Sequence, residues 1–536
     1  VLDGKAKPAG ELRSRRHREI AARAAEESVV LLKNDGDLLP FDAGELSTVA
    51  VIGPNAAARR IQGGGSSHVR PGRRTSMLQA IEEFLTGRAD VVYAEGGDNE
   101  PVPPAARAAM FSPDEARGAA GLLVEYFAER GFAAPPFKTQ PEREIGKLVS
   151  TNSVQRMGNG LGALRWTGWF WPERDGRHEF SLRAPGEGRI LIEGVAIIDA
   201  TTTASHDNWD VGGALAPRRI AAIDLVAGRG YAVTIEYLRP EQTVGIAWEY
   251  VGVGVRQPTG SIAAAAEAAA RCDAAIVVIG AASVSEGEGY DRGDLDLPGD
   301  QNALVEAVLA ANPRTAIVLV GGAPYAMPWI DHAPAVLEAW LGGEEGPDAA
   351  ARILFGATDP SGRLPVSFPR RLEATPAHAW YPGDETVVYG EGLFVGYRHF
   401  DRSAAQPMFP FGHGLTYTQF RYSNLVAPEE VRAGDDVRLT FTLANVGQRS
   451  GAETAQVYVR PRGPSVERPV KELKGFAKVA LEPGEERRVE LRLSARDFSF
   501  WDTERGAWFA EPGSYDLLIG CSAADIELQA TVRLAS

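Results

Sequence analysis

Cysteine is nearly missing from this sequence: only Cys272 and Cys521 occur among 536 residues. Two thiols so far apart exclude a disulfide framework and a cysteine-based metal site. Apolar runs of about 18 residues are also missing, so we expect no transmembrane segment. The chain begins Val1-Leu2-Asp3-Gly4, without an initiator Met or a basic segment followed by an apolar one. No signal peptide is therefore visible, and the sequence leaves open a cytoplasmic protein or one secreted after processing.

Basic residues are fewer than acidic ones in this sequence. With 56 Lys and Arg against 71 Asp and Glu, the formal net charge is -15. This balance argues against nucleic acid or an anionic membrane as a partner. The glycine-rich run 63–67 does not open a helix in the G-x-G-x-x-G pattern, so we expect a tight turn there rather than a nucleotide site. The sequence predicts no cofactor, and it contains no cluster of metal ligands.

The length exceeds what one hydrophobic core normally organises, so several domains are expected. Residues 1–110 alternate helical and strand patterns, and we assign them to the first part of an α/β domain. Helical periodicity covers 11–32 and 76–85. Short apolar strands are expected at 48–53 and 91–93.

The pattern then changes to short alternating strands over 118–255, which predicts an all-β unit. Strand and helix patterns alternate again over 257–420, where the apolar run 274–280 predicts a buried parallel strand. The β unit is therefore expected to be an insertion into one α/β domain. The last part, 425–536, contains about seven short strands and predicts a β-sandwich.

The segment Ser285-Glu286-Gly287-Glu288-Gly289-Tyr290-Asp291-Arg292 follows the predicted strand 274–280. Open α/β sheets place their functional sites at the carboxyl ends of their strands. A carboxylic acid between two glycines can be presented there on flexible backbone. A solvated acidic loop is the alternative, because structural and functional carboxylates look alike in sequence.

Several short motifs follow one another along the chain, and together they resemble glycoside hydrolase family 3, the β-glucosidase family. This resemblance implies an α/β sandwich domain that carries an acid/base Glu, and a TIM-like barrel that carries an Asp nucleophile. The motifs are His17-Arg18 with Glu27 to Asn34, Ala50 to Pro54, Glu288 to Arg292, Pro360 to Pro365, Tyr389 to Arg398 and Phe409 to Tyr417.

The resemblance places the acid/base on Glu288. Glu286 is the competing choice; otherwise it is a neighbouring carboxylate whose charge would help to keep Glu288 protonated. Tyr290 is expected to shape the pocket. By the same resemblance the glycine-rich run lies beside the sugar site, so its side chains are candidate substrate ligands, namely Ser66, Ser67 and His68.

The β insertion is similar to the protective-antigen lectin-type domain that some family members carry near the mouth of the active site. The final sandwich is similar to their fibronectin type III-like domain. In the insertion, Trp209 lies among hydrogen-bonding residues, a combination that suits a sugar. A core position is the equal alternative for Trp209. The aromatic cluster Trp166, Trp169, Phe170 and Trp171 is expected to be sandwich core.

No barrel is visible in this chain. None of its ten Trp residues follows an Asp, as the nucleophile motif of the family requires, and no eight-fold βα pattern occurs. We therefore expect the acid/base-bearing part of a retaining, exo-acting β-glycosidase that removes terminal non-reducing sugars from oligosaccharides or glycosides. The nucleophile would lie on a separate barrel segment.

The α/β domain should then expose an apolar, loop-rich face, through which the chain associates with the barrel or with a second copy of itself. The alternative is a non-catalytic carbohydrate-binding or scaffold protein. The intact Glu288 motif favours the enzyme, because a binding module has no need of the acid.

Overall fold

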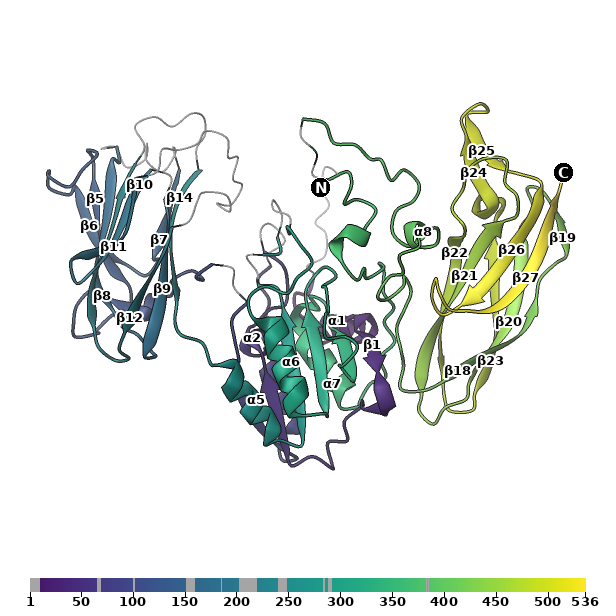
Figure 1. Ribbon diagram of the computed structural model, residues 1–536, viewed down its shortest axis with the longest axis horizontal. Helices are drawn as coiled ribbons and strands as arrows, with labels where there is room; N and C mark the ends of the chain where they lie inside the picture. The colour runs from purple at the N-terminus through teal and green to yellow at the C-terminus, as the bar shows by residue number, and fades with distance from the viewer. Residues whose placement is uncertain are drawn as a thin grey trace.

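The computed structural model describes residues 10–64, 69–99, 102–150, 160–184, 186–201, 219–239, 248–282, 285–287, 292–381, 383 and 385–536. A central α/β body carries one β unit on each side (Figure 1). Over the described ranges, helices stay too short or too polar to cross a membrane.

The central body is built on one six-stranded sheet. Its order is β1-β17-β16-β15-β2-β3, and every neighbouring pair is parallel except β1 with β17. Strands β2 and β3 precede the inserted β unit and β15, β16 and β17 follow it, so the insertion interrupts a single sheet, as predicted. The strands are β1 (Val30–Asn34), β2 (Thr48–Ile52), β3 (Asp90–Ala94), β15 (Ala274–Gly280), β16 (Thr315–Val320) and β17 (Ala335–Glu338).

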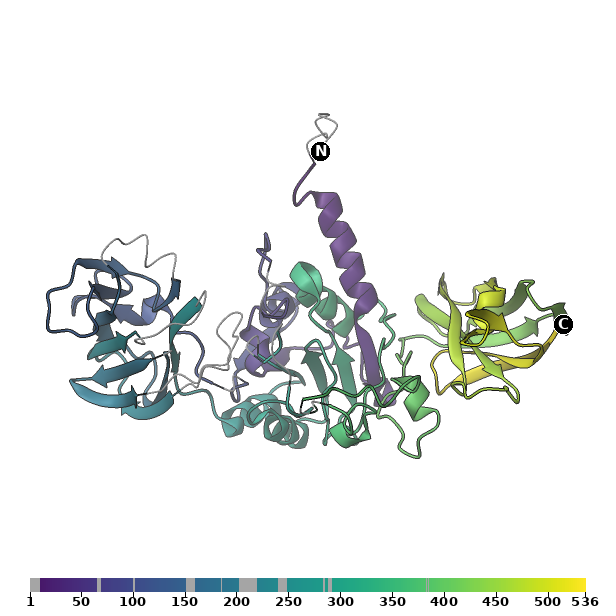
Figure 2. The same cartoon turned by 90° about the horizontal axis from the view of Figure 1, so that it is seen from above.

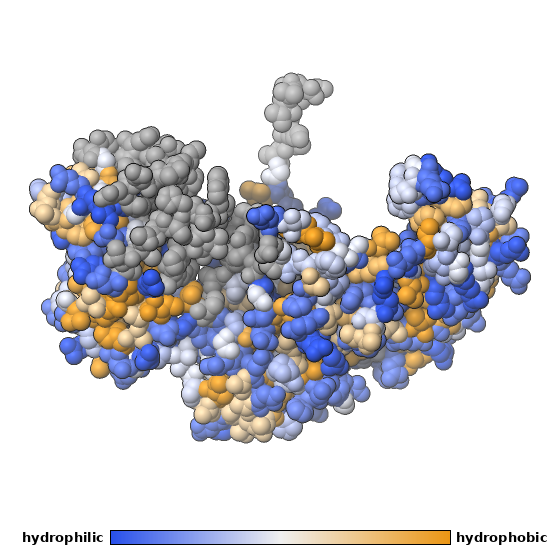
Figure 3. All heavy atoms as spheres, turned by 45° about the horizontal axis from the view of Figure 1, so that its top comes forward, coloured by the Kyte–Doolittle hydropathy of each residue, from blue (hydrophilic) through white to orange (hydrophobic). Residues whose placement is uncertain are grey.

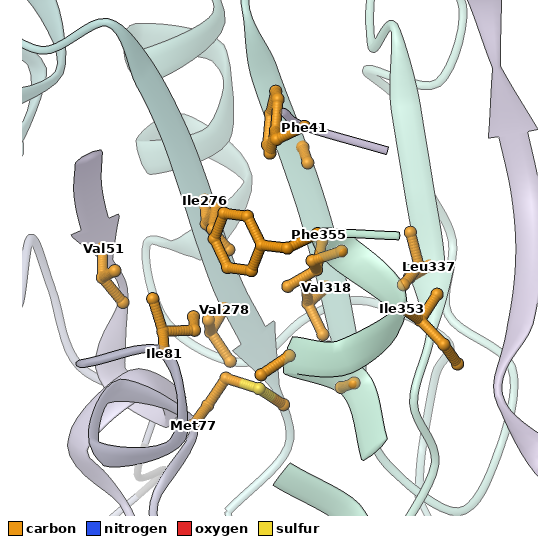
Figure 4. Packing of buried hydrophobic residues seen from close by; sticks show 14 of the residues in the cluster. Phe41, Val51, Met77, Ile81, Ile276, Val278, Val318, Leu337, Ile353 and Phe355 are labelled. Carbon is orange, nitrogen blue, oxygen red and sulfur yellow. The ribbon is translucent and has the colours of Figure 1, made fainter. Parts of the chain in front are cut away.

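Every residue of β15 and of β16 is buried, which is typical of parallel strands covered on both faces. One face packs against α3 (Met77–Leu85) and α7 (Gly346–Leu354). On that face Phe355, which directly follows α7, lies over Ile276 and Val318 of the sheet, and Ile353 of α7 lies beside Leu337 (Figure 4). The helix predicted over 76–85 is α3, with Ser76 as its N-cap.

The opposite face of the sheet packs against α5 (Ile262–Ala270) and α6 (Gln301–Ala311). Successive strand residues point to opposite sides, so Val277 faces this layer while its neighbour Ile276 faces the other. Two short helices, α2 (Pro54–Ala57) and α8 (Tyr397–Phe400), lie in connections.

The prediction of a single helix over 11–32 was wrong at the C-terminal end of that range. Helix α1 (Arg15–Ser28) begins after the N-cap Ser14 and ends at Ser28, and strand β1 follows at once. Val30, Leu31 and Leu32 are buried, and strand β1 pairs with β17. This burial and pairing favour a strand over continuation of the helix. In α1 only Ala25 is buried, and Figure 2 shows this helix projecting from the body.

The inserted β unit consists of two sheets around one core. The aromatic cluster is largely core as predicted: Trp166, Phe170 and Trp171 are buried. An isolated bridge between Ala105 and Gly254 joins the segment that leads into the unit to its last strand, β14. The strands are β4 (Phe111–Ser112), β5 (Leu122–Phe127), β6 (Lys138–Glu142), β8 (Ala163–Phe170), β10 (Glu187–Ile192), β11 (Val195–Thr201) and β13 (Tyr231–Leu238) in one sheet, and β7 (Gly146–Ser150), β9 (Gly176–Arg183), β12 (Arg219–Leu225) and β14 (Trp248–Arg256) in the other.

The C-terminal unit is a β-sandwich, with sheets of three and five strands and an additional two-stranded hairpin. This is more than the seven or so strands predicted, because the hairpin and a short edge strand add to the sandwich. The strands are β18 (Phe420–Val426), β20 (Val437–Asn445) and β23 (Glu486–Leu493); β19 (Glu430–Arg432), β21 (Gly451–Pro461), β22 (Glu472–Leu481), β26 (Gly513–Gly520) and β27 (Ile526–Ala535); and β24 (Ser499–Asp502) with β25 (Ala507–Ala510).

Candidate active site

The segment expected to carry the acid/base begins at the carboxyl end of β15. Ser285, Glu286 and Gly287 are described, whereas Glu288 and Tyr290 lie outside the described residues. The same is true of the other binding candidates, namely Ser66, Ser67, His68 and Trp209. The described geometry of the site is therefore that of the residues next to these segments and of their contact partners.

The glycine-rich run and the acid segment meet in the structure. Gly64 forms a parallel bridge with Gly287, and the Gly64 amide donates to the carbonyl oxygen of Glu286 at 2.8 Å. The two segments follow β2 and β15, which are neighbours in the sheet. Strand order thus brings together two loops that are more than 200 residues apart in the sequence, and Glu288 directly follows the bridged Gly287.

Glu286 is surrounded by hydrogen-bond donors. Its Oε2 accepts from Nη2 of Arg60 at 2.9 Å, and its carboxylate also accepts from the Gly322 amide and, at 3.2 Å, from the Tyr325 hydroxyl. The side chains of Arg60 and Glu286 are only 3% and 10% exposed. A substrate oxygen therefore has little access to this carboxylate, which favours a structural role over that of proton donor.

Arg292 completes the surroundings of Glu286. Its Nη1 lies 3.9 Å from Oε1 of Glu286, and its guanidinium lies over the Tyr325 ring at 4.6 Å from the centroid. Tyr325 is itself fixed, because its hydroxyl accepts from the Ala281 amide at 2.9 Å. The negative charge of Glu286 is thus compensated from two sides.

A further carboxyl group, Glu338, lies at the carboxyl end of β17 and is fully buried. Burial raises the pKa of Glu338 well above its usual value, and the charge of Glu286 raises it further, although a hydrogen bond from the Trp340 amide opposes the rise. The protonated form of Glu338 is therefore favoured.

Sequence reasoning did not identify Arg60, Gly322, Tyr325 or Glu338. Each of them lies close to the carboxyl end of a strand, the edge at which a parallel sheet gathers its sites. The one visible signal was Glu338, a single charged residue that follows a short apolar run. The pairing partner of Arg60 depends on strand order, which the sequence does not display.

Comparison with known proteins gives two family matches. Residues 29–417 match the model described as glycosyl hydrolase family 3 C-terminal domain. Residues 453–523 match the fibronectin type III-like domain.

Individual relatives extend these matches. A β-glucosidase of Rhizobium radiobacter is 34% identical over 529 residues, which cover 96% of this chain and 62% of that protein. The structure of a Kluyveromyces marxianus β-glucosidase in complex with glucose is 32% identical, with a TM-score of 0.83, covering 99% of this chain and 64% of that one. A probable β-glucosidase I of Aspergillus terreus is 34% identical, and the match covers 94% of this chain and 62% of that protein. The chain thus spans less than two thirds of the length of these relatives.

Proposed function

Because the chain belongs to glycosyl hydrolase family 3, we propose that it is the acid/base-bearing part of a retaining, exo-acting β-glycosidase of the β-glucosidase type. Glu288 is the acid/base in this proposal. The observation that carries it is the Gly64–Gly287 bridge, which holds the segment leading into Glu288 against the glycine-rich loop at the carboxyl edge of the sheet. The similar Kluyveromyces marxianus enzyme is in complex with glucose, which supports a glycoside substrate.

Retention requires two carboxyl groups about 5 to 5.5 Å apart. In the first step an Asp on the barrel attacks the anomeric carbon, and Glu288 gives its proton to the departing glycosidic oxygen. In the second step Glu288, now ionised, takes a proton from water while the water oxygen attacks the same carbon. The sugar leaves, the Asp is free, and Glu288 is protonated again.

The barrel is the partner that this mechanism requires. The greater length of the relatives supports it, since the chain covers only 62% of the Rhizobium radiobacter protein. The described part of 380–395 has neither helix nor strand and exposes a series of large apolar side chains. These are Trp380, Tyr381, Val387, Val388, Tyr389, Leu393 and Val395, and Tyr389 is 84% exposed.

This surface, which we call the 380–395 surface, rises from the central body near α8 in Figure 1. Figure 3 shows apolar residues, in orange, interspersed with polar ones over the face of the molecule that it presents. Large apolar side chains that are exposed together in one segment are typical of an interface. We infer that the barrel covers the 380–395 surface in the complete enzyme.

The inserted β unit is proposed to be the lectin-type domain and to border the mouth of the site. Supporting contacts join it to the loop after β3: Arg174 pairs with Glu95 at 2.9 Å, and Arg256 pairs with Asp98. Glu95 directly follows β3 at the carboxyl edge of the sheet. The insertion is therefore tied to the edge that also holds the acid segment.

The test of the proposed function is Glu288→Ala in the enzyme that contains this chain and its barrel. General acid catalysis contributes roughly 10²- to 10⁴-fold, so hydrolysis of substrates with poor leaving groups should fall by that factor. Substrates whose leaving group needs no proton should still form the covalent intermediate, and azide should restore their turnover. A Glu288→Ala enzyme with unchanged rates, or azide rescue of Glu286→Ala alone, would overturn the assignment.

A further inference from the structure

The ion pair of Arg60 and Glu286 connects the loops that follow two neighbouring strands. Arg60 lies just beyond α2, in the connection after β2, whereas Glu286 lies in the segment after β15. We propose that Arg60 and Glu286 form a positioning unit that determines where Glu288 lies. This inference rests on the proposed function, and it replaces the electrostatic role expected for Glu286 from the sequence.

Glu286 is held from both neighbouring strands. Strand β15 lies between β2 and β16 in the sheet. From the β2 side, Arg60 donates to its carboxylate and Gly64 to its carbonyl oxygen. From the β16 side, Gly322 and Tyr325 donate to the same carboxylate. Both the side chain and the backbone of Glu286 are therefore fixed before the chain continues toward Glu288.

The distance along the chain makes this anchor effective. Glu288 is two residues beyond Glu286, and two residues span at most about 7 Å. Over so short a connection, displacement of the anchor is expected to move the acid/base as well. A misplacement of about 1 Å can cost roughly 10²-fold in rate, because the proton must be delivered in line to one oxygen.

Arg60 has no evident substitute for Glu286. Its Nε and Nη1 are buried without hydrogen-bond partners among the described residues. The buried carboxyl group Glu338 favours its protonated form and offers no counter-charge. Loss of Glu286 thus leaves a buried guanidinium uncompensated, and that arrangement must open to water.

The positioning role and the electrostatic role predict different results for the two partners. If the unit positions Glu288, then Arg60→Met and Glu286→Gln act in the same direction, because each breaks the same pair. If the charges act directly on the pKa of the acid, removal of a positive and of a negative charge must shift the pH profile in opposite directions.

The experiment measures kcat/KM of the complete enzyme over a series of aryl glucosides with leaving groups of different pKa. For Arg60→Met and Glu286→Gln we expect losses of about 10- to 100-fold on poor leaving groups and little loss on activated ones. Arg60→Lys keeps the positive charge but not the planar guanidinium, so it should give an intermediate loss of kcat/KM. It also serves as a second variant if Arg60→Met does not fold.

The matched control is Arg363→Met. Arg363 pairs with Glu453 at 2.9 Å, and both side chains are 8% exposed, but this pair joins the central body to the C-terminal sandwich. Loss of this pair should leave the dependence of kcat/KM on the leaving-group pKa unchanged. The inference is overturned if the Arg60 and Glu286 variants behave like this control, or if their pH profiles shift in opposite directions.

Glu288→Ala in the same series separates the inference from the proposed function. If Glu288→Ala changes the leaving-group dependence and the Arg60 and Glu286 variants do not, only the positioning role fails. If Glu288→Ala itself changes nothing, the proposed acid/base fails, and the positioning role fails with it.

Discussion

Trp340 donates its backbone N–H to Oε1 of Glu338 at 2.9 Å, and it does so from a left-handed backbone conformation with φ of 56°. A bulky residue rarely adopts this conformation, so its surroundings must hold it. The indole N–H donates to the carbonyl oxygen of Ser28 at 3.1 Å, and the ring packs edge-on against Phe368. The fully buried carboxyl of Glu338 is thus part of a turn that α1 and the core jointly stabilise.

The first prediction concerns the pH dependence of stability. The folded-state pKa of Glu338 lies above its usual value of 4.5, so the folded protein retains a proton that the unfolded chain releases. The stability from this group is complete below pH 4.5 and is lost as the pH rises toward the folded pKa. Glu338→Gln should therefore be more stable than the wild type at pH 7, with a difference that shrinks as the pH falls toward 4.5.

Urea unfolding between about pH 4 and pH 8 measures this difference. Glu306→Gln is the control, because Glu306 lies on α6 of the same body with a half-exposed side chain. A constant difference between Glu338→Gln and the wild type at every pH would contradict the prediction.

The second prediction is that this chain alone does not hydrolyse an aryl β-glucoside. Without the Asp nucleophile no glycosyl-enzyme intermediate can form. Addition of the barrel segment should produce activity. Turnover by the isolated chain, after its mass has been verified against 57.4 kDa, would refute the division of labour.

The third prediction addresses the 380–395 surface. Tyr389→Ser combined with Leu393→Ser should weaken association with the barrel by at least about tenfold, because large apolar side chains dominate interface energies. Since both residues are exposed, the unfolding free energy of the isolated chain should stay within about 0.5 kcal/mol of the wild type.

Isothermal titration with the barrel measures this affinity. Val426→Ser is the matched control, because Val426 is 61% exposed but belongs to the C-terminal sandwich. If the double variant binds the barrel normally and instead abolishes dimers of this chain in sedimentation, the 380–395 surface belongs to a second copy.

The fourth prediction tests the close approach of β15 to β16. A Cβ added to Gly280, whose φ is 149°, would lie 1.9 Å from the carbonyl oxygen of Val320. Gly280→Ala should therefore lower the unfolding free energy by more than about 1 kcal/mol and disturb the segment that leads to Glu286. Gly346→Ala is the control, since no atom lies within 4 Å of the added Cβ there. Equal stability of the two variants would argue against a steric limit at Gly280.

The sequence predicted those elements whose residues carry the information locally. The run 274–280 is uniformly apolar and became the fully buried β15. The boundary between α1 and β1 was missed, because the burial of Val30 depends on its distant partner β17. Likewise, the segment containing Glu286 was recognised as a candidate site, but its pairing with Arg60 was not. That contact exists only because β2 and β15 are neighbours in space.

The bridge between Ala105 and Gly254 has a consequence for the order of folding during synthesis. Val49 of β2 pairs with Ala274 of β15, so the sheet cannot close until the ribosome has released the entire insertion. The bridge holds the first and last segments of the insertion side by side, which lets the insertion fold first as a self-contained module. Because its two ends lie side by side, the module is replaceable by a short linker that joins them. The strand order of the sheet would then stay intact.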